Sequence, residues 1–182
     1  TQFDVYIIWN PPLFVVMRSV HCPNCTDLEG CRDSHLYVIQ LKEEIGDNYV
    51  KKSTKGYLYV GQTGVSVEKR GKMNFTRKDG TIVDPEALYL DRKKPEDEQK
   101  WPEDGEWVYE TQSIPKIRAY FLKYRPDLVL PPFENPHKFE KNDKGKIDRY
   151  EGKLADKLAN KGWRIINGVS WKKMKKRRNN SS

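Results

Sequence analysis

The sequence predicts one α/β domain of the α+β type, in which a small central antiparallel sheet of about three strands is flanked by helices. The 182 residues are enough for one packed domain with extensions. Short β-branched and aromatic runs alternate with helical stripes of apolar residues, and Gly, Pro and charged residues separate them. We therefore expect a core over residues 35–170, preceded by an extension over 1–34 and followed by a tail over 171–182.

The first elements along the chain are predicted to be strands. Residues 3–8 and 13–17 are β-branched and aromatic. Residues 10–12, Asn-Pro-Pro, cannot continue a strand ladder, so we expect an N-terminal hairpin. The runs at 36–41 and 56–60 have the same composition and are expected to form an antiparallel pair in the core.

The first helix is predicted to begin after Ser66, whose hydroxyl can cap the first turn. Glu68 falls in that turn, where a negative charge is favourable. The helical repeat then places four residues on one face: Val67, Arg70, Gly71 and Asn74.

Two further helices and a strand are predicted in the second half of the chain. The first helix covers 114–124 and ends near Arg125, before Pro126, with an apolar stripe of Ile117, Phe121 and Tyr124. The second covers about 145–161, and Gly162 stands where a C-terminal cap is expected. A strand over 163–167 closes the core.

The segment 84–110 is strongly acidic. It holds ten Asp or Glu residues and four Lys or Arg residues, together with Pro85, Pro95 and Pro102. This composition predicts an exposed insertion in the core rather than a core element. Such a segment could contact a basic partner.

The net charge of +8 is unevenly distributed along the chain. Residues 1–35 hold two cations and four anions, which leaves +10 on the remainder as a candidate phosphate-binding surface. No apolar run approaches the roughly 18–20 residues that span a bilayer, so we expect no membrane association. An intracellular, cytoplasmic protein is expected; the oligomeric state is left open.

A basic run predicts a second phosphate-binding element at the end of the chain. Six of the seven residues at 172–178 are cations: Lys172, Lys173, Lys175, Lys176, Arg177 and Arg178. Such tails bind nucleic acid by releasing counterions and do not select a sequence. The alternatives are a solvated end and, in a nucleated cell, a nuclear-import signal.

Residues typical of one nuclease family occur in order along the core. His35-Leu36-Tyr37 opens the series, Tyr59-Val60-Gly61 follows, and Arg70 lies eleven residues after Tyr59. Glu151 and Asn167 complete it downstream. Over residues 35–168 this order resembles the GIY-YIG nuclease family. The resemblance implies the family fold and these five catalytic residues: Tyr37, Tyr59, Arg70, Glu151 and Asn167.

The resemblance also implies a reaction, which is metal-dependent hydrolysis of phosphodiester bonds, with DNA a more probable substrate than RNA. In that reaction Tyr37 or Tyr59 activates water, and Arg70 holds the scissile phosphate. Lys72 is a further nucleic-acid-binding candidate and, with Lys55 and Lys69, a nearby cation that could lower the pKa of the phenol. Glu151 binds one Mg²⁺ or Mn²⁺. Together these groups would remove a proton, neutralise the phosphorane and stabilise the leaving oxygen.

Two positions depart from the family pattern. Asn74 stands where many members carry His or Tyr, and Gln62 stands where some carry Lys. An amide cannot shuttle protons near neutral pH or lower the pKa of a phenol through charge. The alternative function is therefore a catalytically inactive module that binds nucleic acid and carries a structural zinc site.

The zinc hypothesis rests on Cys22, Cys25, Cys31 and His35, four soft ligands within fourteen residues. His21 is an alternative ligand to His35. The spacing of the second pair matches no common zinc finger, so three reduced thiols without a metal are the competing interpretation.

Glu151 shares a predicted helical stripe with Ile147, Leu154 and Leu158, where an apolar residue ordinarily packs. A carboxylate on a buried face must be paired, protonated or bound to a cation. The sequence leaves open an ion pair with Arg70 or a Lys, and a metal ion.

Overall fold

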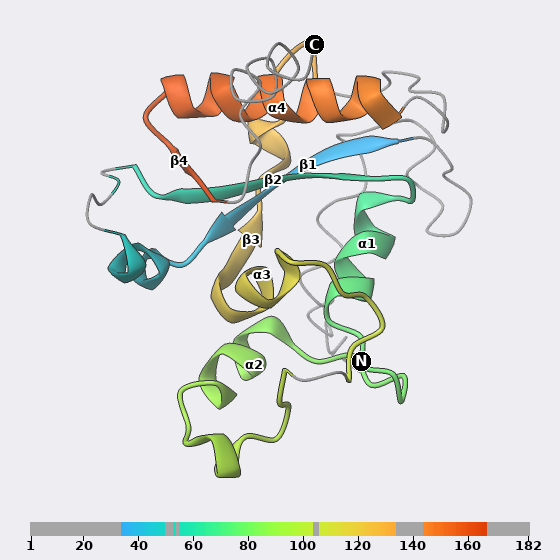
Figure 1. Ribbon diagram of the computed structural model, residues 1–182, viewed down its shortest axis with the longest axis vertical. Helices are drawn as coiled ribbons and strands as arrows, with labels where there is room; N and C mark the ends of the chain where they lie inside the picture. The colour runs from blue at the N-terminus through green and yellow to red at the C-terminus, as the bar shows by residue number, and fades with distance from the viewer. Residues whose placement is uncertain (1–33, 50–52, 54, 104–105, 134–143, 167–182) are drawn as a thin grey trace, which may run out of the picture.

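A four-stranded mixed sheet forms the centre of the molecule in the computed structural model, which describes residues 34–49, 53, 55–103, 106–133 and 144–166 (Figure 1). The strands are β1 (His35–Leu41), β2 (Tyr57–Thr63), β3 (Phe121–Tyr124) and β4 (Arg164–Ile165), in the order β3-β1-β2-β4. β1 pairs antiparallel with β2 and β3, whereas β4 lies parallel to β2. The predicted α+β class and the antiparallel β1–β2 pair are confirmed, and the sheet has one strand more than expected.

The helices cover both faces of this sheet. They are α1 (Val67–Asn74), α2 (Pro85–Asp91), α3 (Ile114–Tyr120) and α4 (Lys144–Asn160). Short 3₁₀ segments complete the elements: η3 (Glu43–Asn48), η4 (Glu96–Glu98) and η5 (Pro126–Leu128). Figure 1 shows α4 across one face, with α2 and α3 on the opposite side.

Alternation along the strands divides the core into two clusters. Leu36 and Val38 of β1 pack with Leu58 and Val60 of β2 beneath the apolar side chains of α4: Ile147, Leu154 and Leu158. The intervening residues face the other way and form the second cluster, which includes Tyr37, Ile39, Leu41, Tyr57, Phe75 and Ile117. The two core strands are therefore buried on both faces.

The helix ends follow their capping residues. The Ser66 hydroxyl accepts a hydrogen bond from the Lys69 backbone N–H at 3.1 Å, as the sequence predicts. Asp84 caps α2 in the same manner through the N–H groups of Glu86 and Ala87. After α4, Gly162 has a φ of 93°, a conformation in which only glycine is unstrained.

The predicted helix over 114–124 is half wrong. α3 ends at Tyr120, and Phe121 begins β3, which pairs with the free edge of β1. Apolar residues three or four positions apart predict a helix, but the same residues can be buried by a helix that is followed by a short strand. Ile117 and Phe121 are buried in this second way. Hydrogen bonding to β1 makes residues 121–124 a strand rather than the end of the helix.

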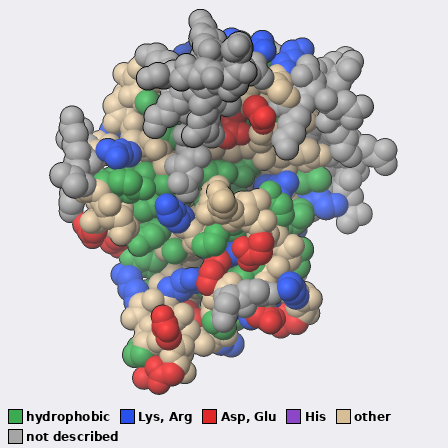
Figure 2. Space-filling view, viewed as in Figure 1, with side chains coloured by type: hydrophobic (Ala, Val, Ile, Leu, Met, Phe, Trp, Pro, Cys, Tyr) green, Lys and Arg blue, Asp and Glu red, His purple; other side chains and the backbone are tan. Residues whose placement is uncertain are grey.

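The acidic segment 84–110 is not an exposed insertion throughout. Leu88 and Trp107 are buried at 0% and 1% relative accessibility. Asp91 is also buried, and its carboxylate accepts hydrogen bonds from the backbone N–H groups of Lys100 and Trp101. The acidic side chains gathered at the lower end of Figure 2 belong to the part of this segment that does remain exposed. The number of acidic residues was a poor guide to exposure, because several of these carboxylates form hydrogen bonds or ion pairs within the protein.

Several predicted features lie outside the described residues: the N-terminal hairpin, the three cysteines with His21, Asn167 and the basic tail. Within the described residues, no helix is long and apolar enough to cross a membrane.

Candidate functional site

Two tyrosines meet on one face of the sheet. Tyr37 of β1 lies opposite Gly61 in the β1–β2 register, and Tyr59 is two residues before Gly61 on the same face of β2. The two rings have centroids 6.1 Å apart at an interplanar angle of 40°. A Cβ atom at Gly61 would lie 2.6 Å from both rings, so glycine is the only residue that leaves them room.

The two hydroxyls have different environments. Tyr37 is 3% exposed, and its pKa is raised well above its ordinary value by burial, with a further contribution from Tyr59. Burial also raises the pKa of Tyr59, but hydrogen bonds with Ser113 and Tyr37 act in the opposite direction. Tyr59 is only partly buried. Tyr59 is therefore the less buried of the two tyrosines, and Tyr37 packs against it.

Arg70 of α1 supplies a positive charge beside this pair. Its Nε donates to the Thr63 Oγ1 at 3.1 Å, and its guanidinium carbon lies 3.9 Å from the centre of the Tyr109 ring. Its charge lowers the pKa of Tyr37 against the larger effect of burial. Among the described residues, its buried Nη1 has no hydrogen-bond partner and no carboxylate pairs with it. The guanidinium is thus fixed at Nε by Thr63, and its buried Nη1 lacks a partner among the described residues.

Asn74 lies beneath Arg70, four residues further along α1. It is 0% exposed, and its backbone carbonyl accepts a hydrogen bond from Arg118 Nη1 at 3.0 Å. Its side chain lies beside Tyr124, whose pKa is raised by burial and lowered by Asn74. Asn74 therefore belongs to the packed floor of the site and presents no group to solvent.

Glu151 of α4 lies within electrostatic reach of Tyr59, and its charge raises the pKa of that phenol. Burial, assisted by the charge of Asp148, raises the pKa of Glu151 to about 7. The Gln62 side-chain N–H group donates to Asp148, and the amide also hydrogen-bonds Glu151. Gln62 thus holds two carboxylates one helical turn apart.

These carboxylates fit a divalent cation. Mg²⁺ is commonly held by one or two carboxylates together with water and substrate oxygens. The hydrogen bond from Gln62 lowers the pKa of Glu151, but burial and the charge of Asp148 outweigh it. In the described part of the chain, neither carboxylate has a Lys or Arg ion-pair partner, and no group of three His, Cys, Asp or Glu residues is assembled. The ion pair between Glu151 and Arg70 that the sequence left open is not formed.

Of the five residues predicted to be catalytic, the structure brings Tyr37, Tyr59 and Arg70 together on one side of β1 and β2. Glu151 belongs to α4, whose apolar side chains pack on the opposite face, and it acts on this group through the effect of its charge on the pKa of Tyr59. Lys72 lies half-buried on α1, two residues beyond Arg70. His35 is fully buried at the start of β1. The zinc hypothesis stays a prediction, since its cysteines lie outside the described ranges.

Sequence reasoning missed four residues of this site. Asp148 precedes Glu151 by three residues, so helical spacing alone could have placed both carboxylates on one face. Gln62 was considered only for the charge that it lacks. Tyr109 and Ser113 had no sequence signal, because they lie in or beside a segment interpreted as an exposed insertion.

Comparisons with known proteins gave no match: no protein-family model, curated protein or solved structure is significantly similar to the chain.

Proposed function

We propose that the protein is a metal-dependent endonuclease that hydrolyses phosphodiester bonds, with DNA the preferred substrate. The observation that carries this proposal is the grouping of Tyr37, Tyr59 and Arg70, with Glu151 near enough for its charge to raise the pKa of Tyr59. These residues come from elements far apart in the sequence. A phenol, an unpaired guanidinium and an acidic pair are the groups that this hydrolysis needs. The order of the same residues along the chain resembles the GIY-YIG family, which supports the same reaction.

In this proposal Arg70 binds the scissile phosphate. Its Nε is fixed by Thr63, and no carboxylate among the described residues pairs with its guanidinium, so a phosphate oxygen can be bound without the loss of an internal ion pair. The charge then acts on the negative oxygens that develop in the transition state. Fixing the guanidinium in advance reduces the entropy cost of orienting it.

Tyr59 is the proton acceptor for the attacking water. Tyr59 is the less buried of the two residues, and hydrogen bonds from Ser113 and Tyr37 stabilise its ionised form. Burial and the charge of Glu151 oppose ionisation in the isolated protein. Neutralisation of Glu151 would remove the second of these effects and bring the phenol closer to a useful base.

Glu151 and Asp148 would hold the divalent cation, with Gln62 fixing the orientation of both carboxylates. When bound, Mg²⁺ or Mn²⁺ supplies Lewis-acid stabilisation of the leaving oxygen. The structural zinc site at Cys22, Cys25, Cys31 and His35 remains a separate prediction.

A second candidate function is a module that binds nucleic acid without cutting it. Two observations favour it: Asn74 is sealed in the floor of the site, and Gln62 provides no charge to activate a phenol. The pKa values of both Tyr37 and Tyr59 are raised, which disfavours a phenolate base without assistance.

Incubation of the full chain with supercoiled plasmid and with single-stranded RNA separates the two candidates. The nuclease is expected to nick plasmid in Mg²⁺ or Mn²⁺ and to be inactive in EDTA. Retention of both nucleic acids in a gel-shift assay, with no cleavage in either metal, would contradict the nuclease and support the binding module. Arg70→Ala should weaken either function and serves as the common control.

A further inference from the structure

We propose that Tyr109 is a positioning residue for Arg70, and that Arg118 fixes Tyr109 in this place. The acidic segment 84–110 then has a function of its own, which is to deliver an aromatic platform to the phosphate-binding guanidinium. This inference deepens the nuclease proposed above and rests on Arg70 as its phosphate-binding group.

The first step is the contact between Tyr109 and Arg70. The guanidinium carbon lies 3.9 Å from the ring centre, well within the range of a cation–π interaction. Arginine that stacks on an aromatic face keeps its N–H groups directed outward in its own plane. Here the Nε–H group donates a hydrogen bond to the Thr63 hydroxyl. The buried Nη1 has no partner among the described residues. The ring therefore restrains the cation without taking up any of its N–H groups.

The second step is the attachment of Tyr109 to α1. Arg118 is 0% exposed, and its Nη1 donates both to the Tyr109 carbonyl at 3.2 Å and to the Asn74 carbonyl at 3.0 Å. Asn74 is the last residue of α1, the helix that carries Arg70. One buried guanidinium thus links the platform to the helix whose arginine it supports.

Two carboxylates keep Arg118 charged inside the protein. Burial lowers its pKa to about 10, and Glu110 acts in the opposite direction. Its Nη2 lies 2.5 Å from a Glu110 carboxylate oxygen, and its Nε donates to Glu103 at 2.9 Å. A pKa near 10 keeps this guanidinium protonated at neutral pH.

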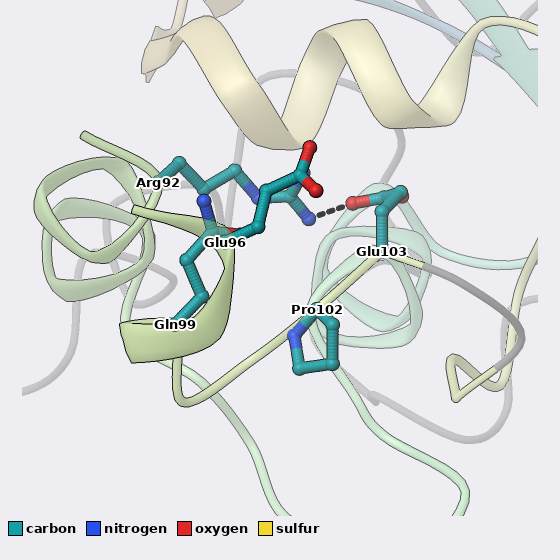
Figure 3. Close-up of a pocket in the computed structure, with 5 residues that line it drawn as sticks. All are labelled: Arg92, Glu96, Gln99, Pro102 and Glu103. Carbon is teal, nitrogen blue, oxygen red and sulfur yellow. Dashed lines mark hydrogen bonds and ion pairs between the residues drawn. The ribbon is translucent and has the colours of Figure 1, made fainter. Parts of the chain in front are cut away.

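Glu103 connects the same network to a pocket of the acidic segment. Figure 3 shows Arg92 and Glu103 directed toward each other across this pocket, where they form an ion pair. The two Glu103 oxygens are divided between Arg92 and Arg118. The carboxylates of the segment that neutralise buried cations are therefore part of its attachment to the core.

The inference can be tested by NMR of arginine side chains in the full chain, with Arg70→Lys to assign the Arg70 Nε–Hε signal. In the wild type we expect this signal to be shifted upfield by the Tyr109 ring current. Tyr109→Phe keeps a ring and should retain the shift, whereas Tyr109→Leu should abolish it. A wild-type signal at the position of a free arginine would overturn the inference before any variant is made.

Inorganic phosphate and a short single-stranded DNA provide the second readout. We expect Tyr109→Leu to weaken the phosphate-induced change in the Arg70 signal and the DNA affinity by about five- to tenfold, the equivalent of one partly exposed cation–π contact. Tyr109→Phe should bind as the wild type does. Equal losses in both variants, or no loss in Tyr109→Leu, would contradict the inference.

Tyr49→Leu is the matched control. It removes a comparable contact, in which the Arg164 guanidinium lies 4.7 Å from the Tyr49 ring centre near the other end of β2. This variant should leave the Arg70 signal and the affinities unchanged. Absence of DNA cleavage by the wild type, with the Arg70 shift still dependent on the ring at position 109, would contradict the nuclease and support the positioning contact.

Discussion

Gly61 stands opposite Tyr37 in the β1–β2 ladder, and the Tyr37 ring lies where a Cβ atom at Gly61 would be placed. The Tyr59 ring lies at the same distance from that position, 2.6 Å. A missing side chain on β2 thus makes the space in which the two phenols meet. The glycine of the Tyr-Val-Gly sequence is explained by this packing.

Gly61→Ala is therefore expected to push the two rings apart. Overpacking of this kind typically costs about 1–3 kcal/mol, and the displaced hydroxyls would lower cleavage by at least about tenfold. Urea unfolding and plasmid nicking measure the two effects. Gly64→Ala is the control, because a Cβ atom there meets nothing within 4 Å. Equal stability and activity of the two variants would contradict this packing.

Tyr59→Phe should lower cleavage more than Tyr37→Phe. Loss of a general base typically costs about 10²–10⁴-fold in rate, and Tyr59 is the less buried of the two tyrosines. Tyr37→Phe removes only a hydrogen bond to Tyr59, so a loss of about tenfold is expected. Single-turnover rates on one oligonucleotide compare the variants. A larger loss in Tyr37→Phe would exchange the roles of the two tyrosines.

Much of this arrangement could be predicted from the sequence. Strand pattern and the Tyr-Val-Gly signature located β1, β2 and the tyrosine pair, and the Ser66 cap located α1. β3 could not be predicted, because it is defined by pairing with β1, which lies about 80 residues earlier in the sequence, and local residue spacing carries no information on such pairing. The burial of the acidic segment was also hidden, since its partner Arg118 lies outside the segment.

The stability of the metal-free protein should depend on pH through Glu151. Its pKa is about 7 in the folded protein, against an ordinary value of 4.5. Between these values the unfolded chain ionises first, so folding stability present below about pH 4.5 is lost as the pH rises through 7. The full loss is about 3 kcal/mol. Thermal unfolding in EDTA from pH 4.5 to 8 measures it.

Glu151→Gln removes the charge that causes this loss, so the melting temperature of the variant should fall less over that pH range than that of the wild type. Mg²⁺ should stabilise the wild type at pH 8 and have little effect on the variant. Identical pH profiles for the two proteins would show that Glu151 is solvated and has an unshifted pKa.

Asp148→Asn tests whether the acidic pair shares one cation. The variant keeps an oxygen near Gln62 and removes the charge that helps to raise the pKa of Glu151. We expect a higher Mg²⁺ concentration for half-maximal cleavage, by about tenfold, with binding of DNA in EDTA unchanged. Asp156→Asn, on the same helix but outside the pair, is the control. An unchanged Mg²⁺ requirement would leave Glu151 as the only acidic ligand.

We propose that Glu151 supports metal-dependent cutting of a nucleic-acid backbone. The most direct test of this claim is the rate of plasmid cleavage by wild type and Glu151→Gln in Mg²⁺ and Mn²⁺, with DNA binding measured on the same preparations. We predict metal-dependent nicking by the wild type, a loss of several orders of magnitude in the variant, and equal DNA affinity. Cleavage by Glu151→Gln at the wild-type rate, or none by either protein, would contradict the claim.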